Sequence, residues 1–187
     1  MSKPLYFLLF LFSSIVFSQK ATQSIEVKEY ILKNGLTVML SENSESSNIY
    51  GVVAVKAGGK NDPKDATGIA HYLEHVLFKG TQELGTTDYE SERVYLDSIS
   101  KLYEKLSKTS LEEKRSAIQK EINRISIKAS QYAIPNELDK LLKQMGGLDI
   151  NAFTNEDYTA YYNSFPPNQI NRWLEIYSHR FQNPVFR

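Results

Sequence analysis

The sequence of 187 residues contains no cysteine, which excludes disulfides and thiolate metal ligands. It also has no net charge, because Lys plus Arg and Asp plus Glu each number 22. A chain with equal numbers of positive and negative residues has no net electrostatic attraction to nucleic acid or to an anionic membrane surface. No apolar run reaches the roughly 18 residues that a membrane-spanning helix needs. We therefore expect no nucleic-acid partner and no stable membrane span.

The overall composition is that of a folded protein. Hydrophobic residues make up 41% of the chain, aromatic residues 12% and charged residues 24%. This mixture can bury a core, and the length suits one structural unit better than two full domains. An exported chain without disulfides would depend on packing or on a metal ion for its stability.

The first residues have the pattern of a secretory signal. Lys3 gives a positive start, residues 5–17 are almost wholly apolar, and Ser18 provides a small residue for cleavage. We predict a signal peptide over residues 1–18 and export to the periplasm or the medium. A membrane anchor is the alternative, but the apolar run is too short to favour it.

Turn residues divide the first half into β-prone segments. Asn34-Gly35 between residues 30–32 and 36–40 predicts a β-hairpin. Residues 49–57 are apolar on both faces, which predicts a strand buried in the sheet. After a glycine-rich turn, a helix is expected from about residue 68 to 78, with Thr67 as its cap.

The second half begins with helical periodicity and then returns to strands. Two apolar stripes within residues 90–130 predict an antiparallel helical hairpin whose charges form a solvated face. A short helix from Pro135 to Met145 follows. Strands are expected at 148–154 and 158–162, and a last amphipathic helix runs from Ile170 toward Asn183-Pro184. The fold class is therefore α+β, with a mainly antiparallel sheet.

Three residues on the helix of residues 68–78 carry the chemistry. His75 lies about 40° around the helix from His71, and Glu74 lies about 60° to the other side, so all three occupy one face. Two imidazoles suit zinc, and a carboxylate beside them can take a proton from a metal-activated water. The alternative is an ordinary helix surface, but a buried strand and a glycine turn just before the helix favour the metal site.

Residues 68–81 resemble the signature of the pitrilysin and insulysin type of metallopeptidase, the inverted zincins, which include mitochondrial processing peptidase. Other matches follow in the family's order: Asn34-Gly35-Leu36, Ala57-Gly58-Gly59, Gly146-Gly147, Asn151-Ala152-Phe153-Thr154, Thr159, Tyr161-Tyr162 and Asn183-Pro184. The resemblance implies a mitochondrial processing peptidase-like fold, with residues 90–130 as an inserted hairpin.

The resemblance also implies the roles of the site residues. Zn²⁺ would be bound by His71 and His75, with Glu74 as general base in the hydrolysis of peptide bonds. The segment Asn151, Ala152, Phe153 and Thr154 would be the edge that holds a peptide as an added strand. The alternative for this segment is a merely structural edge strand.

One zinc ligand is missing from the motif. The family completes its site with a glutamate further along, which here would lie beyond Arg187. Glu156, Asp157 and His179 do not match that position. Residues 25–187 are thus expected to be the N-terminal part of a zinc metallopeptidase domain, incomplete at the C-terminus and inactive alone. A second homologous domain or subunit would be its partner.

Three hypotheses follow for the function. The first is the N-terminal part of an active zinc endopeptidase. The second is a non-catalytic partner subunit of a two-chain peptidase that retains the motif. The third is an unrelated exported binding protein. We favour the first because the motif and its surroundings agree.

Overall fold

A two-stranded hairpin is the first element of the described residues. The computed structural model describes residues 25–187, which form two units that divide after Ser44. In the first unit β1 (Lys28–Ile31) pairs antiparallel with β2 (Thr37–Leu40). Gly35 has a φ of 86°, which favours glycine, and the Asn34 side chain accepts a hydrogen bond from the Leu36 amide at 3.1 Å. The predicted hairpin is confirmed, whereas the predicted signal peptide of residues 1–18 lies outside the described residues.

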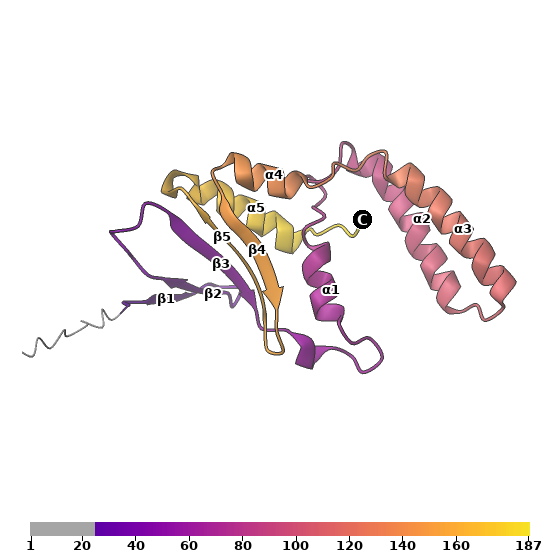
Figure 1. Cartoon of the computed structure of the whole chain (residues 1–187), viewed down its shortest axis with the longest axis horizontal. Coiled ribbons are helices and arrows are strands. Elements are labelled where there is room, and N and C mark those ends of the chain that lie inside the picture. Colours follow the sequence, from indigo (N-terminus) through magenta and orange to yellow (C-terminus); the bar gives the residue numbers. More distant parts are fainter. Residues whose placement is uncertain (1–24) are drawn as a thin grey trace, which may run out of the picture. The chain divides into compact units, whose positions relative to one another are not determined.

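An antiparallel sheet of three strands organises the second unit. The strands are β3 (Ile49–Val55), β4 (Leu148–Thr154) and β5 (Thr159–Phe165), in the order β3-β5-β4. Helices α4 (Glu137–Gln144) and α5 (Ile170–Gln182) lie against one face of this sheet (Figure 1). The predicted α+β class, with an antiparallel sheet backed by helices, is therefore confirmed.

Strand β3 is less buried than its sequence predicts. Tyr50, Val52 and Val55 are 60%, 48% and 39% exposed, so the prediction of a buried strand is wrong. The reason is its position, because β3 is an edge strand of this sheet and the packed helices cover only the opposite face. An apolar sequence cannot distinguish a central strand from an edge strand.

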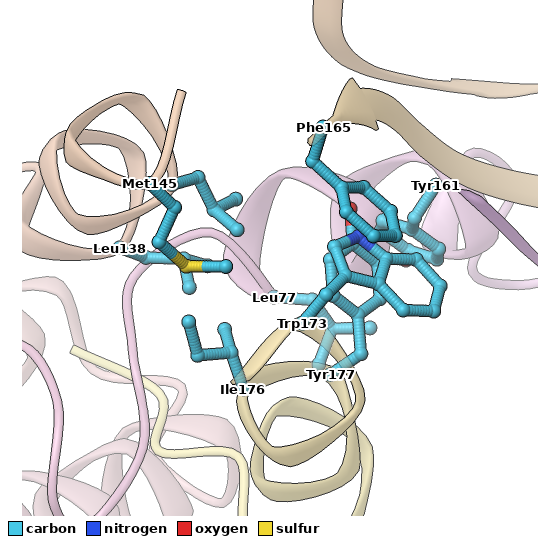
Figure 2. Close-up of a cluster of buried hydrophobic side chains, with 9 residues drawn as sticks. Leu77, Leu138, Met145, Tyr161, Phe165, Trp173, Ile176 and Tyr177 are labelled. Carbon is cyan, nitrogen blue, oxygen red and sulfur yellow. The ribbon is translucent and has the colours of Figure 1, made fainter. Parts of the chain in front are cut away.

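The core fills the space between the central strand and the two helices. On α5, Trp173, Ile176 and Tyr177 follow helical spacing and are at most 5% exposed. Trp173 stacks on Phe165 of β5 with ring centroids 5.1 Å apart. Figure 2 shows this cluster, which Leu138 and Met145 close on the α4 side. This packing fixes the place of β5 and therefore of β4 beside it.

Helices α2 (Tyr89–Ser107) and α3 (Glu112–Ala129) form the predicted helical hairpin (Figure 1). Leu106, Ile118 and Ile122 are buried between the two helices, packed by Ile99 and Leu102. Not every residue of the predicted stripes takes part: Val94, Tyr103 and Leu111 are 63%, 57% and 60% exposed. No helix within residues 25–187 is long and apolar enough to cross a membrane.

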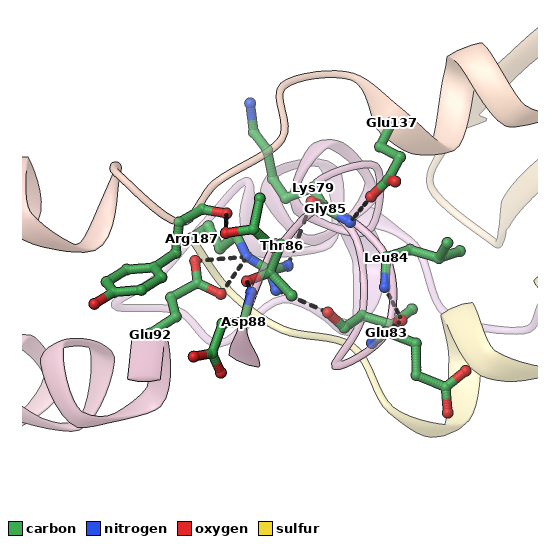
Figure 3. A network of polar contacts seen from close by, with 12 residues as sticks. Lys79, Glu83, Leu84, Gly85, Thr86, Asp88, Glu92, Glu137 and Arg187 are labelled. Carbon is green, nitrogen blue, oxygen red and sulfur yellow. Dashed lines mark hydrogen bonds and ion pairs between the residues drawn. The ribbon is translucent and has the colours of Figure 1, made fainter. Parts of the chain in front are cut away.

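The prediction of a purely solvated charged face for this hairpin is wrong at Glu92. Its side chain is 1% exposed, and its two carboxylate oxygens share the Nε–H of Arg187, at 2.8 and 3.0 Å. Arg187 also donates to the Thr81 carbonyl at 2.8 Å. Figure 3 shows this network, in which the base of α2 meets the loop that follows α1. A buried carboxylate requires a partner such as Arg187. Helical periodicity does not predict this partner, because it lies 95 residues away in the sequence.

Candidate functional site

The helix with the histidine motif is α1 (Ile69–Val76), shorter at both ends than predicted. Its cap is also different, because Thr67 makes no capping bond. Instead the Asp62 carboxylate accepts hydrogen bonds from the amides of Gly68 at 2.6 Å and Ala70 at 3.0 Å. An acidic group at this position satisfies free amides and complements the helix dipole. The preceding loop therefore orients α1.

The two histidines of α1 lie side by side on its surface. Nε2 of His71 and Nε2 of His75 are 3.1 Å apart, and both side chains are exposed. Two nitrogens bound at about 2.0–2.1 Å to one tetrahedral zinc ion lie about 3.3 Å apart. Without a metal ion, one imidazole can donate a hydrogen bond to the other, and after a small shift of the rings the pair fits a shared cation.

Glu74 is on the same helix but points into the protein. It is 6% exposed, and its Oε2 accepts a hydrogen bond from Oγ1 of Thr154 at 2.7 Å. Thr154 Oγ1 also lies 3.2 Å from Oγ1 of Thr159, which donates to the Ala57 carbonyl at 2.9 Å. The carboxylate is thus held by the hydroxyl of Thr154, a bond that joins α1 to β4. Sequence reasoning placed Thr154 on the substrate edge but missed its bond to Glu74, because 80 residues separate the two.

The predicted substrate segment forms the outer edge of the three-stranded sheet. Asn151, Ala152, Phe153 and Thr154 pair with β5 on one side only, and β4 has no second partner strand among residues 25–187. A free edge leaves backbone donors and acceptors available to an added strand. The structure therefore brings Glu74 to the end of an open strand edge.

A glycine turn holds the loop between β4 and β5 near α1. The amide of Gly59 donates to the carbonyl of Asn155 at 2.9 Å. A Cβ on Gly58 would lie 2.3 Å from that same carbonyl oxygen, so a side chain is excluded there. Asp62, which caps α1, lies three residues after Gly59. This close backbone approach links the end of the strand edge to the start of the histidine helix.

The three alternative ligands do not complete a metal site with the histidine pair within residues 25–187. Asp157 forms an ion pair with Lys60, and Nδ1 of His179 lies 3.4 Å from a carboxylate oxygen of Glu83. Glu156 is exposed in the turn between β4 and β5. Within the described part of the chain, no three His, Asp or Glu side chains are arranged to hold one metal ion. Within residues 25–187 the site consists of the imidazoles of His71 and His75 and the carboxylate of Glu74.

Known proteins resemble this chain in both sequence and fold. The model of the family Insulinase (Peptidase family M16) matches residues 37–96 and 122–187, passing over residues 97–121 of the helical hairpin. The "Zinc protease PqqE" of Helicobacter pylori is 31% identical over 120 residues, which are 64% of this chain and 24% of that protein.

Two solved structures share the fold. A protease from Helicobacter pylori superposes with a TM-score of 0.57 at 23% identity, over 87% of this chain and 27% of the other. The first half of the periplasmic protease PqqL from Escherichia coli gives 0.56 at 18% identity, over 86% and 25%. The chain thus spans about a quarter of the length of these relatives.

The family match extends over more than half of the chain and includes α1 with its histidines and β4 with its open edge. It excludes the hypothesis of an unrelated binding protein. The fold of the solved relatives agrees with the predicted one. The chain belongs to the insulinase family of peptidases, family M16.

Proposed function

We propose that this chain provides part of the active site of a zinc endopeptidase. His71 and His75 would hold the metal ion, and Glu74 would act as general base. The observation that carries the proposal is the geometry of α1, where two Nε2 atoms lie 3.1 Å apart beside a buried carboxylate. Relatives named zinc proteases support the same cofactor.

Bound zinc would polarise the scissile carbonyl of the peptide and lower the pKa of the attacking water. The residues of this chain would do the rest. A peptide added along Asn151 to Thr154 would be held by backbone hydrogen bonds, with its length running toward Glu74. Glu74 would take a proton from the attacking water and pass it to the leaving amine. The Thr154 hydroxyl would fix the orientation of that carboxylate.

We further propose that the third zinc ligand comes from a segment outside residues 25–187. Catalytic zinc usually has three protein ligands and a water, and the described residues bring only two together. Peptide substrates and a second homologous domain or subunit would complete the enzyme. We also propose that residues 1–18 are a signal peptide for export. The α2–α3 hairpin would be an insertion into the family fold.

Metal titration tests the first part of this proposal. We expect the 187-residue chain to bind zinc weakly, on the order of micromolar or weaker, and to cleave no peptide. His71→Ala should lower the affinity at least tenfold, because one of two ligands is lost. Glu74→Gln serves as the matched variant and should leave zinc binding within about threefold.

Two results would contradict the proposal. Equal zinc affinity of the wild type and His71→Ala would remove the imidazole pair as ligands. Stoichiometric zinc together with peptidase activity that Glu74→Gln abolishes would show that the third ligand lies within this chain. The second result would retain the roles of His71, Glu74 and His75 and overturn only the external ligand.

A further inference from the structure

One backbone amide of the open strand edge is already bonded by a neighbouring side chain. The amide of Ala152 donates a hydrogen bond to Oδ1 of Asn151 at 2.9 Å. Asn151 is exposed, and both residues belong to β4, the edge strand that contacts α1 (Figure 1). An asparagine side chain can bond a nearby backbone group in place of a sheet partner. The Asn151 carboxamide therefore satisfies a backbone donor of its own strand.

The Ala152 amide faces away from β5, as the hydrogen bonds of the β4–β5 hairpin indicate. At the end of this hairpin the amide of Asn155 donates to the carbonyl of Tyr158 at 3.1 Å, so the backbone of Asn155 faces the partner strand. In an antiparallel pair, residues that face the partner alternate with residues that face away from it. The pairing of β4 with β5 is regular up to this point, so Thr154 and Ala152 face the open edge.

The regular part of this edge is short. An irregularity shifts the register of β4 between Leu148 and Asn151, and Asp149 within it has a positive φ of 52°. A bulge of this kind disrupts regular pairing with a neighbouring strand. An added peptide can therefore follow the edge regularly only over Asn151 to Thr154, where the outward amides are those of Ala152 and Thr154. The amide that Asn151 bonds is one of these two.

We propose that the Asn151 side chain competes with a bound peptide for the Ala152 amide. Its carboxamide bonds this amide while the edge is empty, and a carbonyl group of the added peptide replaces it. This inference rests on the proposed function, in which an extended peptide joins β4 as a further strand. A free strand edge also pairs readily with unrelated chains. The bond to Asn151 therefore restricts the edge to peptides whose own hydrogen bonds outweigh the one that they displace.

Removal of the carboxamide should strengthen the binding of an extended peptide. In Asn151→Ala the Ala152 amide is free for the peptide, and the net contribution of one hydrogen bond corresponds to about twofold to tenfold in affinity. Asn151→Asp keeps an acceptor of the same shape and adds a negative charge, so its affinity should equal that of the wild type or fall below it. Asn123→Ala changes an exposed asparagine of α3 and should bind the peptide as the wild type does.

NMR titration of the 187-residue chain without zinc measures these affinities. The probe is a pentapeptide of alternating threonine and valine with blocked ends, because both residue types favour extended backbone. The side-chain NH₂ resonances of Asn151 should shift as the peptide displaces the carboxamide, whereas the Ala152 amide should stay protected from hydrogen exchange. Without peptide, that amide should exchange faster in Asn151→Ala than in the wild type, because its hydrogen bond is lost.

Three results would overturn this competition. Equal or weaker peptide binding by Asn151→Ala would show that the carboxamide does not oppose the peptide. An unchanged exchange rate of the Ala152 amide in that variant would show that the side chain does not hold the amide in solution. Absence of peptide binding by every variant would contradict the peptide-binding edge itself. Because all measurements are made without zinc, the roles of His71 and His75 are tested separately by the zinc titration.

Discussion

The histidine helix and the helical hairpin are held in place by different forces. Helix α1 has eight residues, and polar contacts position it: Asp62 at its start and the Glu74–Thr154 bond along its length. The α2–α3 hairpin has an apolar seam, and one buried ion pair holds its base. The helix that bears the histidine motif therefore has little apolar support of its own. Its geometry depends on a few hydrogen bonds, so small changes there should alter the site more than the fold.

The largest effect should follow from breaking the ion pair at the base of the hairpin. Glu92→Gln leaves the Arg187 guanidinium, 8% exposed, without its counter-charge. Loss of one partner from a buried pair costs about 3–5 kcal/mol. Chemical denaturation would measure the change in free energy of unfolding. Glu90→Gln, on the exposed side of the same helix, should change it by less than about 0.5 kcal/mol. Similar values for both variants would mean that this pair does not anchor the hairpin.

A smaller effect is expected at the histidine helix. Thr154→Val keeps the side-chain shape but removes the donor to Glu74, leaving a buried carboxylate oxygen without its partner. The expected cost is about 1–3 kcal/mol. Thr154→Ser restores the hydroxyl and should recover most of that stability. If Val and Ser behave alike in thermal unfolding, the hydroxyl is not what holds Glu74.

The smallest effect concerns Tyr161, a buried core residue of β5, and appears only at alkaline pH. Burial raises the pKa of Tyr161 to about 12 from 10.0, because the phenolate is poorly solvated. The unfolded chain therefore loses this proton first, so stability is full below pH 10 and falls as the pH rises toward 12. The loss is about 1 kcal/mol at pH 11.

Denaturation at pH 8 and pH 11 would measure this loss. Tyr161→Phe should reduce the difference between the two pH values, whereas Tyr162→Phe, half-buried on the other face of β5, should leave it as in the wild type. An unchanged difference in Tyr161→Phe would show that another group causes the alkaline loss. The measurement probes apolar burial next to a site that is otherwise held by polar contacts.

Local patterns in the sequence were enough for most elements. Asn34-Gly35 marked the first hairpin, helical periodicity marked α2, α3 and α5, and the glycines after Met145 marked the end of α4. The spacing of His71 and His75 likewise predicted two imidazoles on one helical face. The errors have a common origin. The burial of β3 and the solvation of Glu92 were judged from neighbouring residues, although distant elements decide both.

Local sequence predicted the helix that bears the His-x-x-Glu-His motif and the strand that resembles the substrate edge, and the motifs together carried the resemblance to the family. Periodicity and turn chemistry act over short stretches and place the helix and the strand, whereas the family follows from the resemblance of the motifs and their order. Three features follow from the tertiary structure alone: Thr154 holds Glu74, Arg187 neutralises Glu92, and aromatic rings enclose the guanidinium of Arg180. Each of these contacts joins residues at least 80 positions apart or depends on which surfaces other elements cover. Such contacts follow from strand register and packing, which no short stretch of sequence contains.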